Sequence, residues 1–526
     1  MSRAPDFSPP EVVAQERAHE SPLSRMVRNS AFNAIGTLLI VPSNFLALFT
    51  LARRLGAQPL GTFFTIFAIS AVIHWIADAG TTTVLTRRVA RTPERLKEII
   101  PEALGVLCVV CMVSSTLFLL IAVPWMAIFT DRVSLAVLIV AAAAMWSRHG
   151  LDFAANALRG LERFEYENLS RVVQTFTFCL FVWLWVYPST GGALAGFIAY
   201  AASNFIAAAL IWGVLLVKWR CSGFKLNREV ITRWWSESIP LGAGDVVRQF
   251  LLQMDTLLLA AFRPQAIVGM FSIAARPLQP LQLLPRIIVS VTFPMLSRAA
   301  HVDRSAVNRL FEKTTSILWA ASLPISIGIS MAAEPMIVAT AGPKFADAAV
   351  PLQILIWATG LIFINAQLRF VLTALDAERV YWRLICWTLA VKVVLEAIMI
   401  PLWGMYGACV GNLLGEAALC CGGMIALRKF QVAGPHWTRF LRPLPAAAAM
   451  AAVMWPFARS GASIVNLVGA GIGGGLLYVA VALASGVLPW ADARRLWNSL
   501  KRPALVPALE PAAVVAMADT ADAMPG

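Results

Sequence analysis

The sequence predicts an all-α fold of about 14 transmembrane helices, and three observations predict it. Apolar residues make up 59% of the 526-residue chain and charged residues only 14%, whereas about 25% of the residues in soluble domains are charged. The mean hydropathy is +0.72. The apolar residues gather in runs of about 20, the length that a helix needs to cross the hydrocarbon core of a bilayer. These observations exclude a water-soluble fold.

The apolar runs follow one another along the chain with short loops between them. The predicted spans are 31–51, 61–80, 102–123, 127–147, 170–187, 192–217, 238–261, 266–297, 314–333, 350–374, 382–401, 404–427, 440–458 and 463–488. No loop is longer than about 20 residues, so we expect no inserted soluble domain. The tail from residue 491 is rich in Ala and Pro and is predicted to be disordered.

Lys and Arg residues are distributed asymmetrically between the two sides. Of the 43, 32 fall in the two tails and in every second loop, 6 fall in the opposite loops, and 5 lie inside spans. One of the positive loops contains Arg148 and Arg171. Positively charged loops stay on the cytoplasmic side, so both termini are predicted to be cytoplasmic. This distribution explains the net charge of +14 without nucleic-acid binding.

A weak internal repeat predicts two related halves. The segments LARRLGAQPLGTFFTI from Leu51 and LAAFRPQAIVGMFSI from Leu259 both place Leu-Ala ten residues before a Gly that opens the next helix. Many transporters are built from such repeats. We therefore expect two six-helix lobes around a central cavity, plus two extra C-terminal helices. The predicted units are a cytoplasmic tail 1–28, an N-lobe 29–218, a cytoplasmic linker 219–237, a C-lobe 238–430, two helices in 431–490 and a tail 491–526.

The sequence lacks the common motifs of nucleotide and metal chemistry. It has no G-x-x-x-x-G-K-[ST] loop, no H-E-x-x-H and no D-x-D pair. Nearly all of the eight Cys lie in apolar stretches, where they frame neither disulfides nor a zinc site. We therefore expect a protein that is not an enzyme and that has neither a cofactor nor a metal site.

Five basic residues lie inside predicted spans, where a charge costs about 2.5–3.5 kcal/mol on insertion scales and is usually functional. They are Arg248, Arg276, Arg286, Arg369 and Lys392. Arg276 has no acidic residue within one helical turn, and it directly precedes the first of four prolines that interrupt the eighth span. Broken helices are where transporters commonly build their sites. Arg286 and Arg369 either line a cavity or reach the headgroup region.

Five acidic residues lie at comparable depth and are candidates for coupling transport to an ion. They are Asp78, Asp245, Asp255, Glu396 and Glu416. Asp245 lies three residues before Arg248, and Lys392 lies four residues before Glu396, so each pair can form on one helix face. The sequence does not decide between H⁺ and Na⁺ as a coupling ion.

Asp255 and Arg276 have no local partner of opposite charge, which predicts that they face a cavity or each other. Asp78 lies in a D-x-G turn, where it either caps a helix or couples an ion. Several Arg residues around one cavity would select an anion, because guanidinium donates two parallel hydrogen bonds to phosphate. The residues therefore predict a transporter with an anionic, phosphate-bearing cargo.

Three stretches resemble a known family. They are LFTLARRLGAQPLGTFFTIFAISAVIHWIADAGTTTVLTRRVAR from Leu48 to Arg91, the segment from Ile239 to Arg298, and LDAERVYWRL together with IPLWGMYGACVGNLLGE, which ends at Glu416. These stretches are similar to polysaccharide flippases of the O-antigen and exopolysaccharide type. That family belongs to a superfamily that also contains multidrug exporters and lipid II flippases. The resemblance extends over roughly residues 29–430.

The resemblance implies a protein of the bacterial cytoplasmic membrane that moves undecaprenyl-diphosphate-linked oligosaccharides to the outer leaflet by alternating access. It implies membrane lipid, a polysaccharide polymerase and export machinery as partners, and no nucleic acid. It also assigns Arg276 to the diphosphate, because related lipid II flippases keep a cavity arginine at this position. The alternatives are a multidrug or metabolite antiporter, which would need an acidic cavity, and a membrane polysaccharide polymerase, which would need a large outward loop.

Overall fold

Helices make up all of the regular structure in the described part of the chain. The computed structural model describes residues 22–129, 133–186, 192–221, 223–434, 437–459 and 464–485. No β-strand occurs within these ranges, so the all-α fold is confirmed. The predicted tail 491–526 and residues 1–21 of the predicted N-terminal tail lie outside the described residues.

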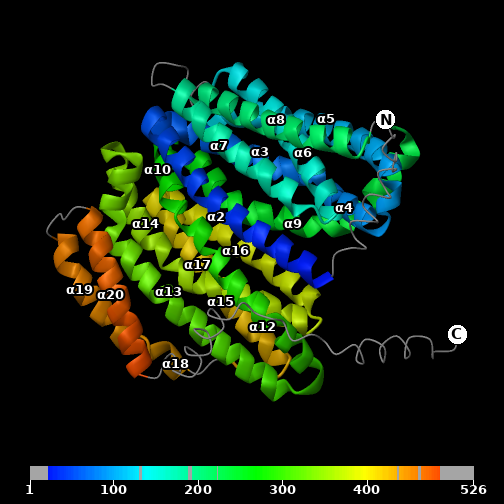
Figure 1. The fold of residues 1–526 in the computed structure, drawn as a ribbon. Coiled ribbons are helices and arrows are strands. Elements are labelled where there is room, and N and C mark those ends of the chain that lie inside the picture. Colours follow the sequence, from blue (N-terminus) through cyan, green and yellow to red (C-terminus); the bar gives the residue numbers. More distant parts are fainter. Residues whose placement is uncertain are drawn as a thin grey trace, which may run out of the picture.

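Helices α2–α8, which we call the N-terminal bundle, occupy mainly the upper part of Figure 1. They are α2 (Pro22–Leu55), α3 (Ala57–Asp78), α4 (Thr81–Arg91), α5 (Leu96–Phe129), α6 (Leu135–Gly160), α7 (Phe164–Trp185) and α8 (Ala193–Lys218), with the 3-10 helix η1 (Pro93–Arg95) before α5. Helix α2 packs along α7, and α6 packs along α8. Helix α2 begins before residue 28, so the end of the predicted N-terminal tail is helical.

Helices α10–α17, which we call the C-terminal bundle, lie mainly in the lower part of Figure 1. They are α10 (Gln265–Ala275), α11 (Leu278–Leu281), α12 (Leu283–Val302), α13 (Arg304–Ala341), η2 (Pro343–Ala348), α14 (Ala349–Ile356), α15 (Ala358–Ala374), α16 (Glu378–Trp403) and α17 (Met405–Lys429). The break between α10 and α12 lies at the predicted proline-rich site, because Pro has no N–H for the helix ladder. Helices α16 and α17 pack against each other as a hairpin.

The last helices form a separate layer at the edge of the C-terminal bundle. They are α18 (Trp437–Leu441), α19 (Leu444–Arg459) and α20 (Ile464–Ala484). Helices α19 and α20, orange in Figure 1, pack on each other and against α13. The Tyr478 hydroxyl donates a hydrogen bond to the Ala320 carbonyl oxygen at 2.7 Å and fastens α20 to α13.

Helix α9 (Arg228–Phe262) connects the two bundles. Val230 and Trp234 are buried in the core of the N-terminal bundle, whereas the second half of α9 packs against α16 and α17. The predicted linker 219–237 is therefore helical from Arg228 onward. The side chain of Asn227 accepts a hydrogen bond from the Val230 N–H at 2.8 Å, and this cap fixes where the helix begins.

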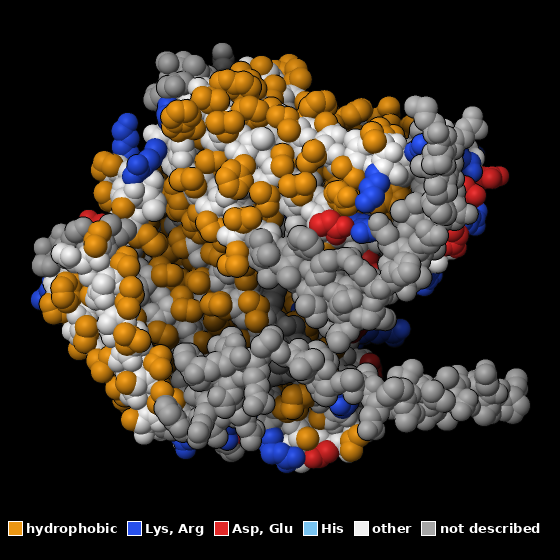
Figure 2. Space-filling view, viewed as in Figure 1, with side chains coloured by type: hydrophobic (Ala, Val, Ile, Leu, Met, Phe, Trp, Pro, Cys, Tyr) orange, Lys and Arg blue, Asp and Glu red, His pale blue; other side chains and the backbone are white. Residues whose placement is uncertain are grey.

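The surface and the helix lengths identify a multi-pass membrane protein. Among the described residues, ten helices are long and apolar enough to cross a membrane, and two bent helix pairs bring the number to twelve. Each of the predicted spans overlaps a helix or a bent pair; α7 and α9 are the long helices that fall below this apolar limit. Figure 2 shows hydrophobic side chains spread over both bundles, with charged side chains mostly toward the rim.

Candidate functional site

A cavity with two adjoining compartments lies between the bundles. The first, of about 310 Å³, is bounded by α2, α3, α7 and α8 and by the segment α10–α12. The second, of about 240 Å³, is bounded by α3, α6 and α8 and by α9. Phe67 and Tyr200 line both compartments, and their ring centroids are 5.7 Å apart. Each volume is close to the lower limit of about 300 Å³ for small-molecule pockets, so each compartment has room for a small polar group.

Arg276 supplies the positive charge of the first compartment. Its guanidinium lies 4.4 Å from the centroid of the Phe64 ring, and Nη1 donates a hydrogen bond to Oε1 of Gln279 at 3.3 Å. The other lining residues are mostly aromatic or aliphatic: Val41, Asn44, Phe45, Leu48, Phe63, Phe67, Phe178, Tyr200, Pro280 and Leu283. None of these described lining residues is acidic, so the remaining guanidinium donors are available to an anion.

Six polar side chains line the second compartment, and the sequence analysis singled out none of them as a site residue. They are Ser70, His74, Arg148, Tyr200, Gln249 and Gln253. The ring of His74 stacks on that of His149, with centroids 4.0 Å apart and planes inclined by 15°. Nε2 of His74 lies 3.4 Å from Oδ2 of Asp152, which is buried behind the cavity wall.

The prediction that Arg148 and Arg171 lie in a loop is wrong. Helix α6 continues to Gly160 and α7 begins at Phe164, so both arginines lie within helices. Nε of Arg148 donates to Oδ2 of Asp152 at 2.8 Å, and Nη2 of Arg171 donates to Oδ1 at 3.2 Å. Because these hydrogen bonds pair both arginines with Asp152, helix α6 can continue through this polar stretch at a lower free-energy cost. The four-residue spacing of Arg148 and Asp152 was the signal available in the sequence.

Two of the other predicted arginines, Arg248 and Arg369, have neighbours of their own. Nε of Arg248 is 3.6 Å from Oδ1 of Asp245, the neighbour that its spacing in α9 predicts. The Arg369 side chain is exposed on α15 and lies near a tyrosine ring. Neither Arg248 nor Arg369 lines the two compartments. The side chain of Arg286 lies outside the described residues.

Asp255 faces neither the two compartments nor Arg276, because another helix supplies its partner. Nζ of Lys392 on α16 lies 2.5 Å from Oδ1 of Asp255 and 3.8 Å from Oε1 of Glu396. Asn412 on α17 donates a hydrogen bond to Oδ2 of Asp255 at 2.6 Å. The predicted Lys392–Glu396 pair therefore exists within a larger cluster, in which Lys392 approaches Asp255 more closely. All three charged side chains are buried.

Two further predicted acids accept hydrogen bonds from neutral donors. Oε2 of Glu416 accepts from Nδ2 of Asn365 at 2.7 Å. The carboxylate of Asp78 accepts from the backbone N–H groups of Gly80 and Thr82, each at 3.2 Å, and from two threonine hydroxyls. Of the two roles that the sequence left open for Asp78, these contacts describe the cap of α4.

The bundles touch at one end of the cavity through α3 and α10. A Cβ atom at Gly61 would collide with the carbonyl oxygen of Gln265, and a Cβ atom at Gly269 would collide with that of Ala57. The hydroxyl of Thr65 donates a hydrogen bond to Oε1 of Gln265 at 2.6 Å. Glycine at both positions thus permits direct backbone contact between the helices.

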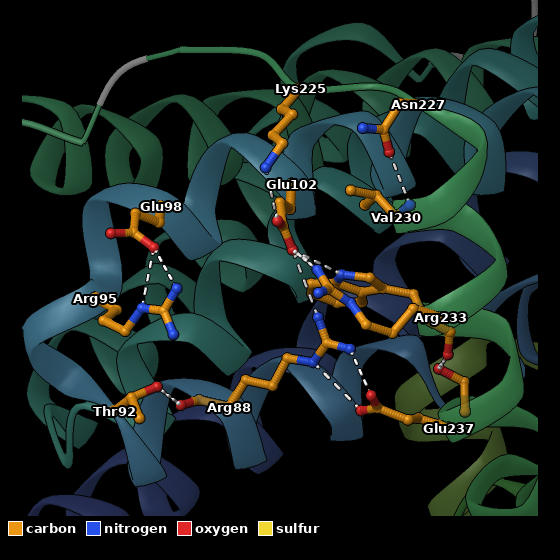
Figure 3. Close-up of polar contacts among 12 residues, drawn as sticks. Arg88, Thr92, Arg95, Glu98, Glu102, Lys225, Asn227, Val230, Arg233 and Glu237 are labelled. Atoms are coloured by element: carbon orange, nitrogen blue, oxygen red, sulfur yellow. Dashed lines mark hydrogen bonds and ion pairs between the residues drawn. The ribbon is translucent and has the colours of Figure 1, made fainter.

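Charged side chains connect α4, α5 and α9 at the other end of the cavity, as Figure 3 shows. Nη2 of Arg88 lies 2.7 Å from Oε1 of Glu237, and its guanidinium lies 4.5 Å from the centroid of the Trp234 ring. Glu102 accepts a hydrogen bond from Nη2 of Arg233 at 2.7 Å. The first half of α9 is therefore attached to the N-terminal bundle by ion pairs as well as by apolar packing.

The fold is similar to those of solved transporters. The fold matches "Lipid II flippase MurJ, inward closed conformation" with a TM-score of 0.68 and 12% identity, covering 88% of this chain and 99% of that one. It matches an inward-facing multidrug resistance MATE family transporter of the MOP superfamily with a TM-score of 0.60 and 14% identity, covering 74% and 94%. At these identities the similarity establishes the fold alone.

The sequence match establishes the family. The model for polysaccharide biosynthesis proteins matches residues 26–300, which is more than half of the chain, so the chain belongs to this family. Over 214 residues it is also 26% identical to "Probable flippase AglR" of Haloferax volcanii. That match covers 38% of this chain and 43% of the relative, so the chain spans less than half the length of this relative.

Proposed function

We propose that the protein is a flippase that moves a diphosphate-linked saccharide lipid, with undecaprenyl as the lipid, across the bacterial cytoplasmic membrane. The observation that carries the proposal is Arg276, whose guanidinium lies in the interbundle cavity with no acidic neighbour among the described lining residues. The phosphate oxygens of a diphosphate can accept two parallel hydrogen bonds from a guanidinium. The family, the flippase names of two similar proteins and the shared transporter fold support the same conclusion.

The proposed mechanism keeps the polyprenyl tail in lipid while the cavity carries the polar head. Water in the cavity and the Arg276 charge replace the hydration that the diphosphate loses in the bilayer. The contact between the bundles at Gly61 and Gly269 would open at one end of the cavity while the bundles close at the other end, and the reverse movement would restore the first state. No covalent bond changes. The membrane potential acting on the anion, or exchange of H⁺ or Na⁺ at a buried carboxylate, would provide the energy.

We further propose the orientation that the charge distribution predicts, with both termini cytoplasmic, and a division into the lobes 29–218 and 238–430. The Arg88 end of the cavity would then face the cytoplasm, where the cargo is loaded. Cargo released outside would pass to a polysaccharide polymerase and to export machinery. Labelling of single cysteines with an impermeant reagent in intact cells tests this orientation, and labelling at residue 500 from outside would refute it.

A multidrug antiporter fits the cavity less well. A cationic drug would need an unpaired carboxylate, but Asp152, which contacts the lining residue Arg148, is bound by both Arg148 and Arg171. A polymerase would need a large outward loop, and among the described residues the helices are joined by short connections. Both alternatives predict a different result in the experiment below.

The experiment measures transport of a fluorescent polyprenyl-diphosphate disaccharide in proteoliposomes, using an outside-only reagent to count molecules in each leaflet. We expect the Arg276→Ala protein to flip at least ten times more slowly, and Arg276→Lys to recover part of the rate because an ammonium lacks the bidentate geometry. Arg428→Ala, at an exposed position at the end of α17, is the matched control. Equal rates for Arg276→Ala and the control would refute the assignment of the diphosphate to Arg276.

A further inference from the structure

The second compartment contains polar chemistry that a diphosphate and a lipid tail do not require. We propose that it binds the saccharide part of the cargo, and that Arg148 selects a saccharide with a carboxylate, such as a uronic acid. The inference rests on the proposed function and names the substrate class of the same cavity. Its subject is a different compartment from that of Arg276.

The lining of the second compartment suits a sugar. Gln249 and Gln253 are one helical turn apart on α9, and both face the compartment. Their amides, together with the hydroxyls of Ser70 and Tyr200, provide donors and acceptors that match sugar hydroxyl groups. Trp75 adds an aromatic side chain to the wall, and an aromatic ring is a flat apolar surface. By contrast, the first compartment contains mainly Phe and aliphatic side chains.

The net charge of the ionised side chains beside this compartment is positive even when His74 and His149 are neutral. Asp152 is shared by Arg148 and Arg171, so one negative charge faces two positive ones. The Arg148 side chain is 35% exposed and that of Asp152 only 11%, so the guanidinium meets the cavity while the carboxylate lies behind it. Protonation of His74 or His149 would add further positive charge.

The next carboxylate does not cancel this charge. Glu167 is ion-paired with Arg159, lies 3.8 Å from Nε of Arg171, and is not among the residues that line the compartment. Its side chain is 6% exposed. A neutral sugar would leave the surplus positive charge of Arg148, Asp152 and Arg171 without a counter-charge, whereas a sugar carboxylate would accept charge-assisted hydrogen bonds from Arg148.

The order of the two compartments matches the covalent order of the cargo. In a diphosphate-linked saccharide the first sugar is bonded directly to a phosphate, so the two binding subsites must adjoin. Here the Arg276 compartment and the Arg148 compartment share Phe67 and Tyr200 as a common wall. A diphosphate at Arg276 thus places the sugars next to Arg148, Gln249 and the other polar side chains.

The test compares two synthetic cargos with the same polyprenyl diphosphate, one carrying a glucose disaccharide and the other its glucuronic acid analogue. We expect the native protein to flip the acidic cargo faster. Arg148→Gln should slow the acidic cargo at least ten times more than the neutral one, and Arg148→Lys should recover part of the difference. Arg428→Gln, an exposed position on α17, is the control.

A second variant avoids the contact with Asp152, in case Arg148→Gln does not fold. Gln253→Glu puts a negative charge on the opposite wall with almost no change in shape, and it should slow the acidic cargo selectively. If the native protein flips both cargos equally and Gln253→Glu affects them equally, the saccharide assignment is overturned while the proposed function stands. If the native protein flips neither cargo, the proposed function itself fails.

Discussion

Lys392 tests whether the buried charges of the C-terminal bundle stabilise the fold. Its Nζ atom lies 2.5 Å from Oδ1 of Asp255, and the two side chains are 6% and 12% exposed. Lys392→Met removes the ammonium but keeps a chain of similar length against Gly415, which packs on the Lys392 methylenes. Asp255 would then be a buried carboxylate without a cation. Removing one partner of a buried ion pair costs about 3–5 kcal/mol, and this is the loss we expect.

The assay is equilibrium unfolding in mixed micelles, followed by tryptophan fluorescence over a titration with a denaturing detergent. Lys429→Met is the matched control, because Lys429 is exposed at the end of α17 and a surface lysine contributes within about 0.5 kcal/mol. The double variant Lys392→Met with Asp255→Asn should recover part of the loss, since it removes the unpaired Asp255 carboxylate and Asn412 still has an oxygen to bind, while Glu396 stays without a cation. A loss for Lys392→Met within about 1 kcal/mol of the control would refute the reasoning.

The contacts at the two ends of the cavity give two further predictions. Gly269→Ala should weaken the contact with Ala57 and lower the free energy of unfolding. Gly469 has open space around it, so Gly469→Ala should raise the free energy of unfolding by about 0.5–1 kcal/mol. The two unfolding curves check both expectations, and equal shifts would contradict the close contact at Gly269. Arg88→Glu should replace the pair with Glu237 by a repulsion between like charges and lower the free energy of unfolding, and the added change Glu237→Arg should restore part of it. A double variant no more stable than the single one would show that this pair does not help to hold the first half of α9 to the N-terminal bundle.

The helices could be predicted from the sequence because their signal is local. A run of about 20 apolar residues forms a helix in a bilayer without contacts from the rest of the chain. For this reason every predicted span overlaps a helix or a bent helix pair of the structure. The same is true of the break after Arg276, which follows from the missing N–H of Pro277. The hydrogen bonds of Asp78 are also local in sequence, because the two threonines that donate to it lie three and four residues after it.

The pairing of buried charges could not be predicted, because it depends on which helices meet. Nothing near Asp255 in the sequence indicates Lys392, and nothing near His74 indicates that it stacks on His149. Arg148 was misplaced for a related reason. A cluster of arginines between two apolar runs normally indicates a loop, and here Asp152 allows the helix to continue through it.

Pairing also separates the charges that support the fold from those that can bind cargo. Lys392 and Asp255 form an ion pair away from the two compartments, so neither offers an unpaired charge to a ligand there. Arg276 is held on the cavity wall by an aromatic ring and an amide, which offset part of its desolvation without cancelling its charge. Arg148 shares its carboxylate with a second arginine, so it too keeps positive charge. A buried charge that is not cancelled is costly in a membrane interior, and these two arginines border the same cavity.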